Sequence, residues 1–105
     1  MAPFLAHLVA AQPNRPTVYA EPFAGGAGAA LYLLTEGLVE RIALNDLNDG
    51  VAAFWRSVFT DTDRLVRSIS WARLTLNEWH RQREAYLDEQ ADPFDRGFAL
   101  SLIHI

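Results

Sequence analysis

The sequence contains no cysteine and no lysine, and each absence narrows the classes of protein to which it can belong. Without cysteine there can be no disulfide bond, no thiolate zinc site and no cysteine nucleophile. The same absence is typical of an intracellular protein, and we expect a cytoplasmic location. All nine basic residues are arginine, against 13 acidic residues. The formal net charge of −4 argues against a polycation that binds nucleic acid by bulk charge.

Long apolar runs are missing as well. None is near the length that crosses a bilayer, and the first eleven residues lack the basic start and cleavage pattern of a secretory signal. The three histidines, His7, His80 and His104, have no metal-ligand spacing, so no metal site is expected. A chain of 105 residues, half of them apolar, predicts one globular domain.

Apolar periodicity and turn signals predict strands that alternate with helices in the first part of the chain. Helices are expected at residues 3–11, at residues 29–36 and from Asn48 or Asp49 onward, and strands at residues 17–20 and 41–45. The first strand is expected to be buried. Such alternation predicts a parallel sheet with right-handed crossovers.

From residue 61 onward the pattern is helical. Residues 61–69 form one predicted helix, and Thr75 with Glu78 has the spacing of a capping box. Asp92 as N-cap and Pro93 at the first helical position open a last helix, which stops inside an apolar stripe without a C-terminal signal. We interpret the chain as a fragment of a longer protein; the alternative is a short helix docked at a true terminus.

A glycine-rich segment, EPFAGGAG at residues 21–28, follows the first predicted strand and opens a predicted helix. That context is required of a nucleotide-type fingerprint. Glycine tolerates a positive φ and lets a ligand approach the main chain, and the free N–H groups of the helix start favour a negatively charged group. The alternative is a tight strand-to-helix connection without a ligand.

An acid, Asp46, stands where the second strand should end. A carboxylate at this place can accept hydrogen bonds from two ribose hydroxyls, and open α/β sheets bind ligands at the carboxyl ends of their strands. Asp46 and Asn48 could both simply cap the third helix. We prefer Asp46 as a ligand-binding residue and Asn48 as the cap.

The identity of the ligand is indicated by two features. A dinucleotide pattern that starts at Gly26 fails at its third glycine, where Leu31 stands, which argues against NAD or FAD. Glu21 would repel a pyrophosphate but attract the cationic amino-acid part of S-adenosylmethionine. Two alternatives remain open: another nucleotide-binding α/β enzyme of the NAD type, and a non-catalytic α/β binding module.

Residues 21–28, with Leu31 and Leu33 after them, resemble the first motif of DNA adenine-N6 methyltransferases of the Dam type. Residues 44–48, followed by Phe54 and Trp55, resemble the second motif of that family, and the resemblance covers roughly residues 1–58. It implies a Rossmann-like S-adenosylmethionine-dependent methyltransferase fold, a partial parallel sheet with flanking helices, followed by a helical segment.

By this resemblance, the full-length protein would transfer a methyl group from S-adenosylmethionine to the exocyclic amino group of adenine in double-stranded DNA, and a restriction endonuclease is a candidate partner. Residues 1–60 would be the N-terminal part of the cofactor-binding domain, and residues 61–105 a truncated helical segment and a candidate for the start of the target-recognition region. The residues assigned to the cofactor are Glu21, Pro22, Phe23, Gly25, Gly26, Gly28 and Asp46.

Two family features are absent from the sequence. The Gly-Gly-Lys segment before the first helix is missing, and so is the catalytic tetrapeptide of Asp or Asn, two prolines and an aromatic residue. The nearest string, at residues 92–95, is expected to be a helix cap. No catalytic residue is therefore assigned, and the chain alone is expected to be inactive. The arginines of the helical segment are expected to lie on solvated faces: Arg73, Arg81, Arg83 and Arg96.

Overall fold

The structure is a computed structural model that describes residues 2–14 and 16–104 of the chain. The described residues form six helices and one two-stranded parallel sheet, an α/β architecture. The chain divides into two compact units, Met1–Leu47 and Asn48–Ile105, which are described here one at a time. No helix in the described ranges has the length and apolar character needed to cross a bilayer.

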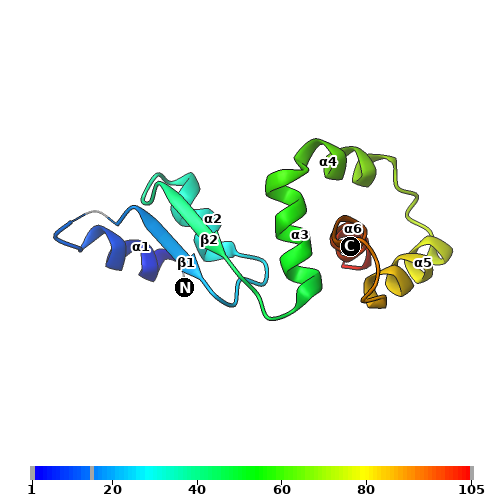
Figure 1. Cartoon of the computed structure of the whole chain (residues 1–105). Coiled ribbons are helices and arrows are strands. Elements are labelled where there is room, and N and C mark those ends of the chain that lie inside the picture. The colour runs from blue at the N-terminus through cyan, green and yellow to red at the C-terminus, as the bar shows by residue number, and fades with distance from the viewer. Residues whose placement is uncertain (1, 15, 105) are drawn as a thin grey trace. The chain divides into compact units, whose positions relative to one another are not determined.

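The first unit contains the sheet. Its elements are α1 (Ala2–Ala10), β1 (Val18–Glu21), α2 (Gly28–Thr35) and β2 (Arg41–Leu44). The two strands run parallel, with Val18 opposite Arg41 and Glu21 opposite Leu44. Helix α2 makes the crossover between them (Figure 1). The prediction of a parallel sheet connected through a helix is confirmed.

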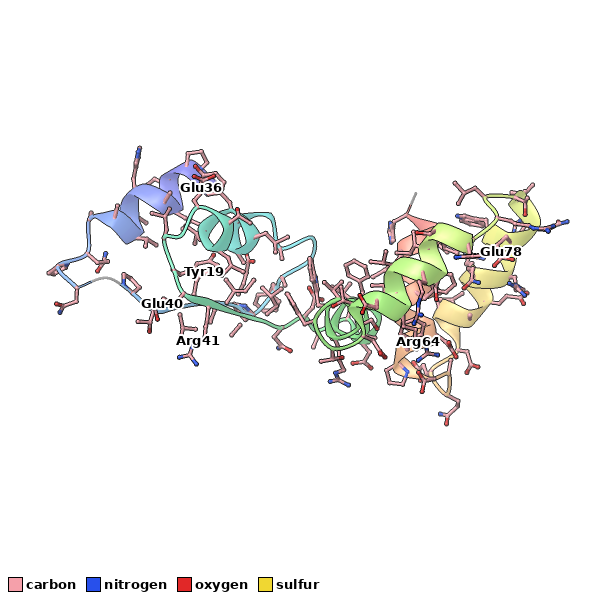
Figure 2. The ribbon with its side chains drawn as sticks, turned by 90° about the horizontal axis from the view of Figure 1, so that it is seen from above. Tyr19, Glu36, Glu40, Arg41, Arg64 and Glu78 are labelled. Atoms are coloured by element: carbon pink, nitrogen blue, oxygen red, sulfur yellow. The ribbon has the colours of Figure 1, made fainter. Side chains whose placement is uncertain are left out.

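Only one face of this sheet is covered. Each strand alternates between an exposed and a half-buried residue. Tyr19 lies on the side of the sheet where α2 packs, and Arg41 points to the opposite side (Figure 2). Leu33 of α2 is fully buried and lies in the small core of this unit. The prediction of a buried first strand is therefore wrong for one face, because no described element packs on the side of Val18.

The second unit is helical, with α3 (Asp49–Thr60), α4 (Thr62–Trp71), α5 (Leu76–Leu87) and α6 (Pro93–Ile103). Helix α6 packs against the other three, as Figure 1 shows. Gly97 allows α6 to approach α3 closely, since a Cβ at this position would lie 2.8 Å from the main-chain oxygen of Ala53.

Local capping signals are confirmed at three helix starts. Asn48 Oδ1 accepts hydrogen bonds from the main-chain N–H groups of Gly50 and Val51, at 2.8 and 3.2 Å. Asp92 Oδ1 accepts from the N–H of Phe94 at 2.9 Å. Thr75 Oγ1 accepts from the N–H of Glu78 at 3.1 Å.

The capping box at Thr75 is only half formed. The carboxylate of Glu78 accepts from Arg81 Nη2 at 2.7 Å and from Gln82 Nε2 at 2.8 Å, and the Thr75 N–H donates to the carbonyl of Arg73. Two side-chain donors on the first turns of α5 therefore hold the carboxylate.

Of the two tryptophans in the helical unit beyond α3, both expected to pack as large apolar residues, only Trp79 does so. Trp79 Nε1 donates to the carbonyl of Ile103 at 3.3 Å, which ties α5 to the end of α6. Trp71, the last residue of α4, is 86% exposed. The described residues of its own unit supply no surface that covers Trp71.

The two units meet in sequence between Leu47 and Asn48, so α3 belongs to the helical unit. The division at residue 60 into a cofactor-binding part and a target-recognition part stays a prediction about function.

Candidate functional site

The glycine-rich turn lies between β1 and α2, at the carboxyl end of the sheet. Gly25 has φ +49°, and Ala27 also adopts the left-handed conformation, with φ +52°. The expectation that this turn needs a positive φ thus holds at Gly25, while Ala27 adopts one without being glycine. Ala27 is buried, and its N–H donates to the carbonyl of Ala24 at 2.7 Å.

Three glycines of the turn face open space. A Cβ at Gly25, Gly26 or Gly28 would meet no atom within 4 Å. Packing within the described chain therefore does not require glycine at Gly26 or Gly28, where φ is also ordinary. A small residue with open space beyond it is what the close approach of a ligand to the main chain would require.

The structure brings Asp46 to this turn. Asp46 Oδ2 accepts a hydrogen bond from the main-chain N–H of Gly25 at 3.0 Å. Next to it, the N–H of Ala24 donates to the carbonyl of Asn45 at 2.8 Å, and the N–H of Asn45 donates to the carbonyl of Glu21 at 2.9 Å. Three hydrogen bonds thus join the glycine-rich turn to the segment after β2, and the two sequence motifs form one site.

Glu21 ends β1 at the same edge of the sheet. Its Oε2 atom is buried and has no hydrogen-bond partner among the described residues. Burial, and after it the negative charge of Glu21, raises the pKa of Tyr19 above its ordinary value. A buried carboxylate oxygen without a donor is costly, so a cationic or N–H group of a ligand would be stabilised here.

The remaining predicted residues, Pro22 and Phe23, lie at the start of the turn. Pro22 is exposed, and Phe23 is 76% exposed beside the turn. Sequence reasoning missed Ala27 and the carbonyl of Asn45, which both shape the turn. A small residue between two glycines was the available signal for Ala27. The sequence holds no signal for the carbonyl of Asn45, because every residue type has a main-chain carbonyl.

The string at residues 92–95 forms the start of α6 in the helical unit. The Asp92 carboxylate caps α6, and the Phe94 ring is buried, with Arg64 stacked 3.7 Å above its centre. The prediction that this string is a helix cap is confirmed. Across residues 2–14 and 16–104, no three His, Asp or Glu side chains are grouped so that they could hold a metal ion.

Comparison with known families decides the relationship that this geometry suggests. The model of the D12 class N6 adenine-specific DNA methyltransferases matches residues 2–97. The chain belongs to this family. The match includes both motifs of the site and extends beyond residue 58, where the resemblance read from the sequence ended, through α3, α4 and α5.

A curated relative of the chain is also a methyltransferase. The Type II methyltransferase M.MjaIII of Methanocaldococcus jannaschii is 32% identical over 71 residues, which are 65% of this chain and 25% of that protein. The chain therefore spans about a quarter of the length of this relative. No solved structure is matched with significance.

Most arginines of the helical segment are engaged within their own unit. Arg81 pairs with Glu78, and Arg96 Nε donates to the carbonyl of Tyr86 at 3.1 Å. Arg83 lies 6.0 Å from the centre of the Trp79 ring. Arg73, in the segment between α4 and α5, is exposed and differs from these three.

Proposed function

We propose that this chain supplies the cofactor-binding part of an S-adenosylmethionine-dependent DNA adenine-N6 methyltransferase with a Rossmann-like fold. The whole enzyme would transfer a methyl group to the exocyclic amino group of adenine in double-stranded DNA. The observation that supports this most strongly is the hydrogen bond from Gly25 to Asp46, because it unites the two family motifs at the carboxyl end of a parallel sheet.

The residues present fit S-adenosylmethionine. The buried Oε2 atom of Glu21 needs a donor, and the ammonium of the methionine part would supply one with the opposite charge. The open space at Gly26 and Gly28 allows a ligand to reach the main chain. When bound, S-adenosylmethionine would supply the methyl group.

Asp46 has a second role in this proposal. A carboxylate offers about four acceptor positions, so Asp46 can hold the Gly25 N–H and also accept from ribose hydroxyls. The hydrogen bond to Gly25 fixes the carboxylate relative to the turn before a ligand arrives. Phe23, which is exposed at the start of the turn, offers an apolar surface to the ligand.

Calorimetric titration with S-adenosylmethionine tests the site. Asp46→Ala should weaken binding by about 1–3 kcal/mol, because the acceptor for the ribose is lost. Asp46→Asn is the matched variant: its amide oxygen can still accept from Gly25, so the turn persists while the charge is gone. An intermediate affinity is expected. Wild-type affinity in both variants would remove Asp46 from the site.

Catalysis is expected to need residues that this chain does not contain. The family's catalytic tetrapeptide is absent from the sequence, so the purified chain should bind cofactor and transfer no methyl group to duplex DNA. Transfer of radiolabelled methyl groups to adenine by the chain alone would contradict this part of the proposal.

A further inference from the structure

The stretch that runs from the first turn of α4 to the start of α5 differs in charge from its surroundings. Residues 64–77 contain three arginines and no acidic residue, whereas residues 78–95 contain six acidic residues and two arginines before Arg96. The helical unit as a whole is acidic, and this segment is its basic part. Such local separation favours contact with a polyanion at one place on the surface.

The same segment carries the most exposed aromatic residue of the helical unit, Trp71. Arg67 precedes it by one helical turn, so the two side chains share a face of α4. Both are exposed. An arginine and a tryptophan on one face present a charge for a phosphate and a flat ring for a base.

Beyond Trp71 the chain is extended and borders a groove of about 280 Å³. Arg73, Leu74 and Leu76 lie on its walls, and the two leucines are each more than 70% exposed. Glu78, labelled on α5 in Figure 2, also lines this groove. Its charge is compensated by Arg81 at 2.7 Å, and this contact and the Gln82 amide lower the pKa of Glu78.

Arg64, the third arginine of the segment, is excluded from this surface by its contacts. Its guanidinium stacks on Phe94 at 3.7 Å and lies 3.8 Å from Asp61. Arg64 is exposed like Arg67 and Arg73, but these contacts hold its guanidinium against Phe94 and Asp61.

We propose that Arg67, Trp71 and Arg73 form a DNA-contacting surface, in which the two guanidinium groups bind phosphates and the indole of Trp71 stacks on an unpaired or unstacked base. The inference rests on the proposed function, which makes DNA the substrate. An enzyme that takes a base out of the duplex leaves exposed base faces, and a large aromatic side chain can occupy them. The acid-free basic segment favours a polyanion, and the exposed ring of Trp71 favours DNA over an acidic protein surface or a second copy of this acidic chain, because DNA offers bases on which the ring can stack.

The test is fluorescence anisotropy of labelled duplex DNA titrated with the chain at several salt concentrations. Trp71→Ala should weaken binding roughly fivefold to a hundredfold, the range found for loss of one base–aromatic stack. The double variant Arg67→Ala, Arg73→Ala should lower the slope of log affinity against log salt by about two, because two phosphate contacts are lost.

Matched controls remove the same groups elsewhere. The double variant Arg41→Ala, Arg56→Ala loses two exposed charges, and Phe4→Ala removes an exposed ring from α1. Both should leave the salt slope and the affinity near wild type. Equal losses in the controls, or an unchanged affinity in Trp71→Ala, would overturn the proposal, as would a wild-type chain that fails to bind duplex DNA at low salt.

Two further measurements separate this inference from the proposed function. Trp71→Ala should bind S-adenosylmethionine like the wild type, because Trp71 lies in the other unit from the site. If the chain binds S-adenosylmethionine but its affinity for DNA does not depend on Trp71, only the inference is wrong. If the chain does not bind S-adenosylmethionine, the proposed function is wrong. If sedimentation shows self-association that Trp71→Ala abolishes while DNA binding is unchanged, Trp71 contacts a second copy and the inference is wrong.

Discussion

The surroundings of the glycines differ between the two units of this molecule. In the sheet unit, a Cβ at Gly26 would meet nothing within 4 Å, whereas in the helical unit a Cβ at Gly97 would meet the main chain of Ala53 and Phe54 at 2.8–2.9 Å. The described chain places no atoms beside the glycines of the turn, whereas the main chain of α3 packs directly against Gly97. The comparison shows a packing role for Gly97, and the open space at Gly26 is consistent with the proposed approach of a ligand.

The largest expected effect sharpens the contrast between the covered and the uncovered face of the sheet. Leu33→Ala should destabilise the sheet unit by about 2–5 kcal/mol, because Leu33 is fully buried. Val18→Ala, on the uncovered face, should cost about 0.5 kcal/mol or less. Hydrogen exchange of the α2 amides measures the stability of this unit directly. Equal losses from both variants would mean that the two faces are equally buried.

Substituting a glycine in each unit tests the difference between them. Gly97→Ala should destabilise the helical unit by about 1–3 kcal/mol, since a main-chain neighbour cannot move aside as a flexible side chain can. Gly26→Ala should leave stability within about 0.5 kcal/mol of wild type. It should nevertheless weaken binding of S-adenosylmethionine, measured by calorimetry. Unaltered cofactor binding in Gly26→Ala would show that no ligand approaches there.

A smaller effect is expected at the start of α3. The Tyr86 hydroxyl donates to Asn48 Oδ1 at 3.0 Å, the oxygen that also caps the helix. Tyr86→Phe should therefore lower the free energy of unfolding by about 0.5–1.5 kcal/mol. Tyr32→Phe, at a partly exposed position of α2, is the control for loss of a hydroxyl. Urea denaturation would measure both, and equal values would assign no stabilising role to the Asn48 contact.

The smallest effect concerns pH. Hydrogen bonds from Arg81 and then Gln82 lower the pKa of Glu78 below its ordinary value of 4.5. The ionised carboxylate therefore contributes stability above pH 4.5, and the contribution is lost as the pH falls through the lowered pKa. NMR titration of the side-chain carboxyl should show this, and Arg81→Gln should return the pKa toward 4.5. A titration unchanged by Arg81→Gln would contradict the assigned cause.

Local signals allowed most elements to be predicted from the sequence. Asn48, Thr75 and Asp92 cap helices through contacts two or three residues along the chain, so spacing alone identifies them. The helix expected at residues 29–36 is present as α2, and Gly37, with φ +71°, follows its end. Such contacts need no knowledge of the rest of the fold.

Features that depend on distant contacts could not be predicted. The packing of α3 with α6 depends on Gly97 facing Ala53, which are far apart in sequence, and this packing places α3 in the helical unit. The exposure of Trp71 depends on which surfaces the chain supplies to cover it. Apolar periodicity identifies a face that can be buried, and says nothing of the partner.

The candidate site was predictable in place and not in detail. Strand order brought Glu21 and Asp46 to one edge of the sheet, as the general rule for parallel sheets requires. The hydrogen bond from Gly25 to Asp46 depends on the main-chain conformation of Gly25, and the orphaned oxygen of Glu21 depends on burial. Neither property can be read from residue types.

One calorimetric comparison tests most directly whether the sheet unit binds the methionine and ribose parts of an adenosyl ligand through separate carboxylates. S-adenosylmethionine and adenosine are titrated against wild type, Glu21→Gln and Asp46→Ala. Glu21→Gln should weaken only S-adenosylmethionine, because adenosine has no amino-acid part, whereas Asp46→Ala should weaken both ligands. Equal affinities of all three proteins for S-adenosylmethionine would contradict the proposed site.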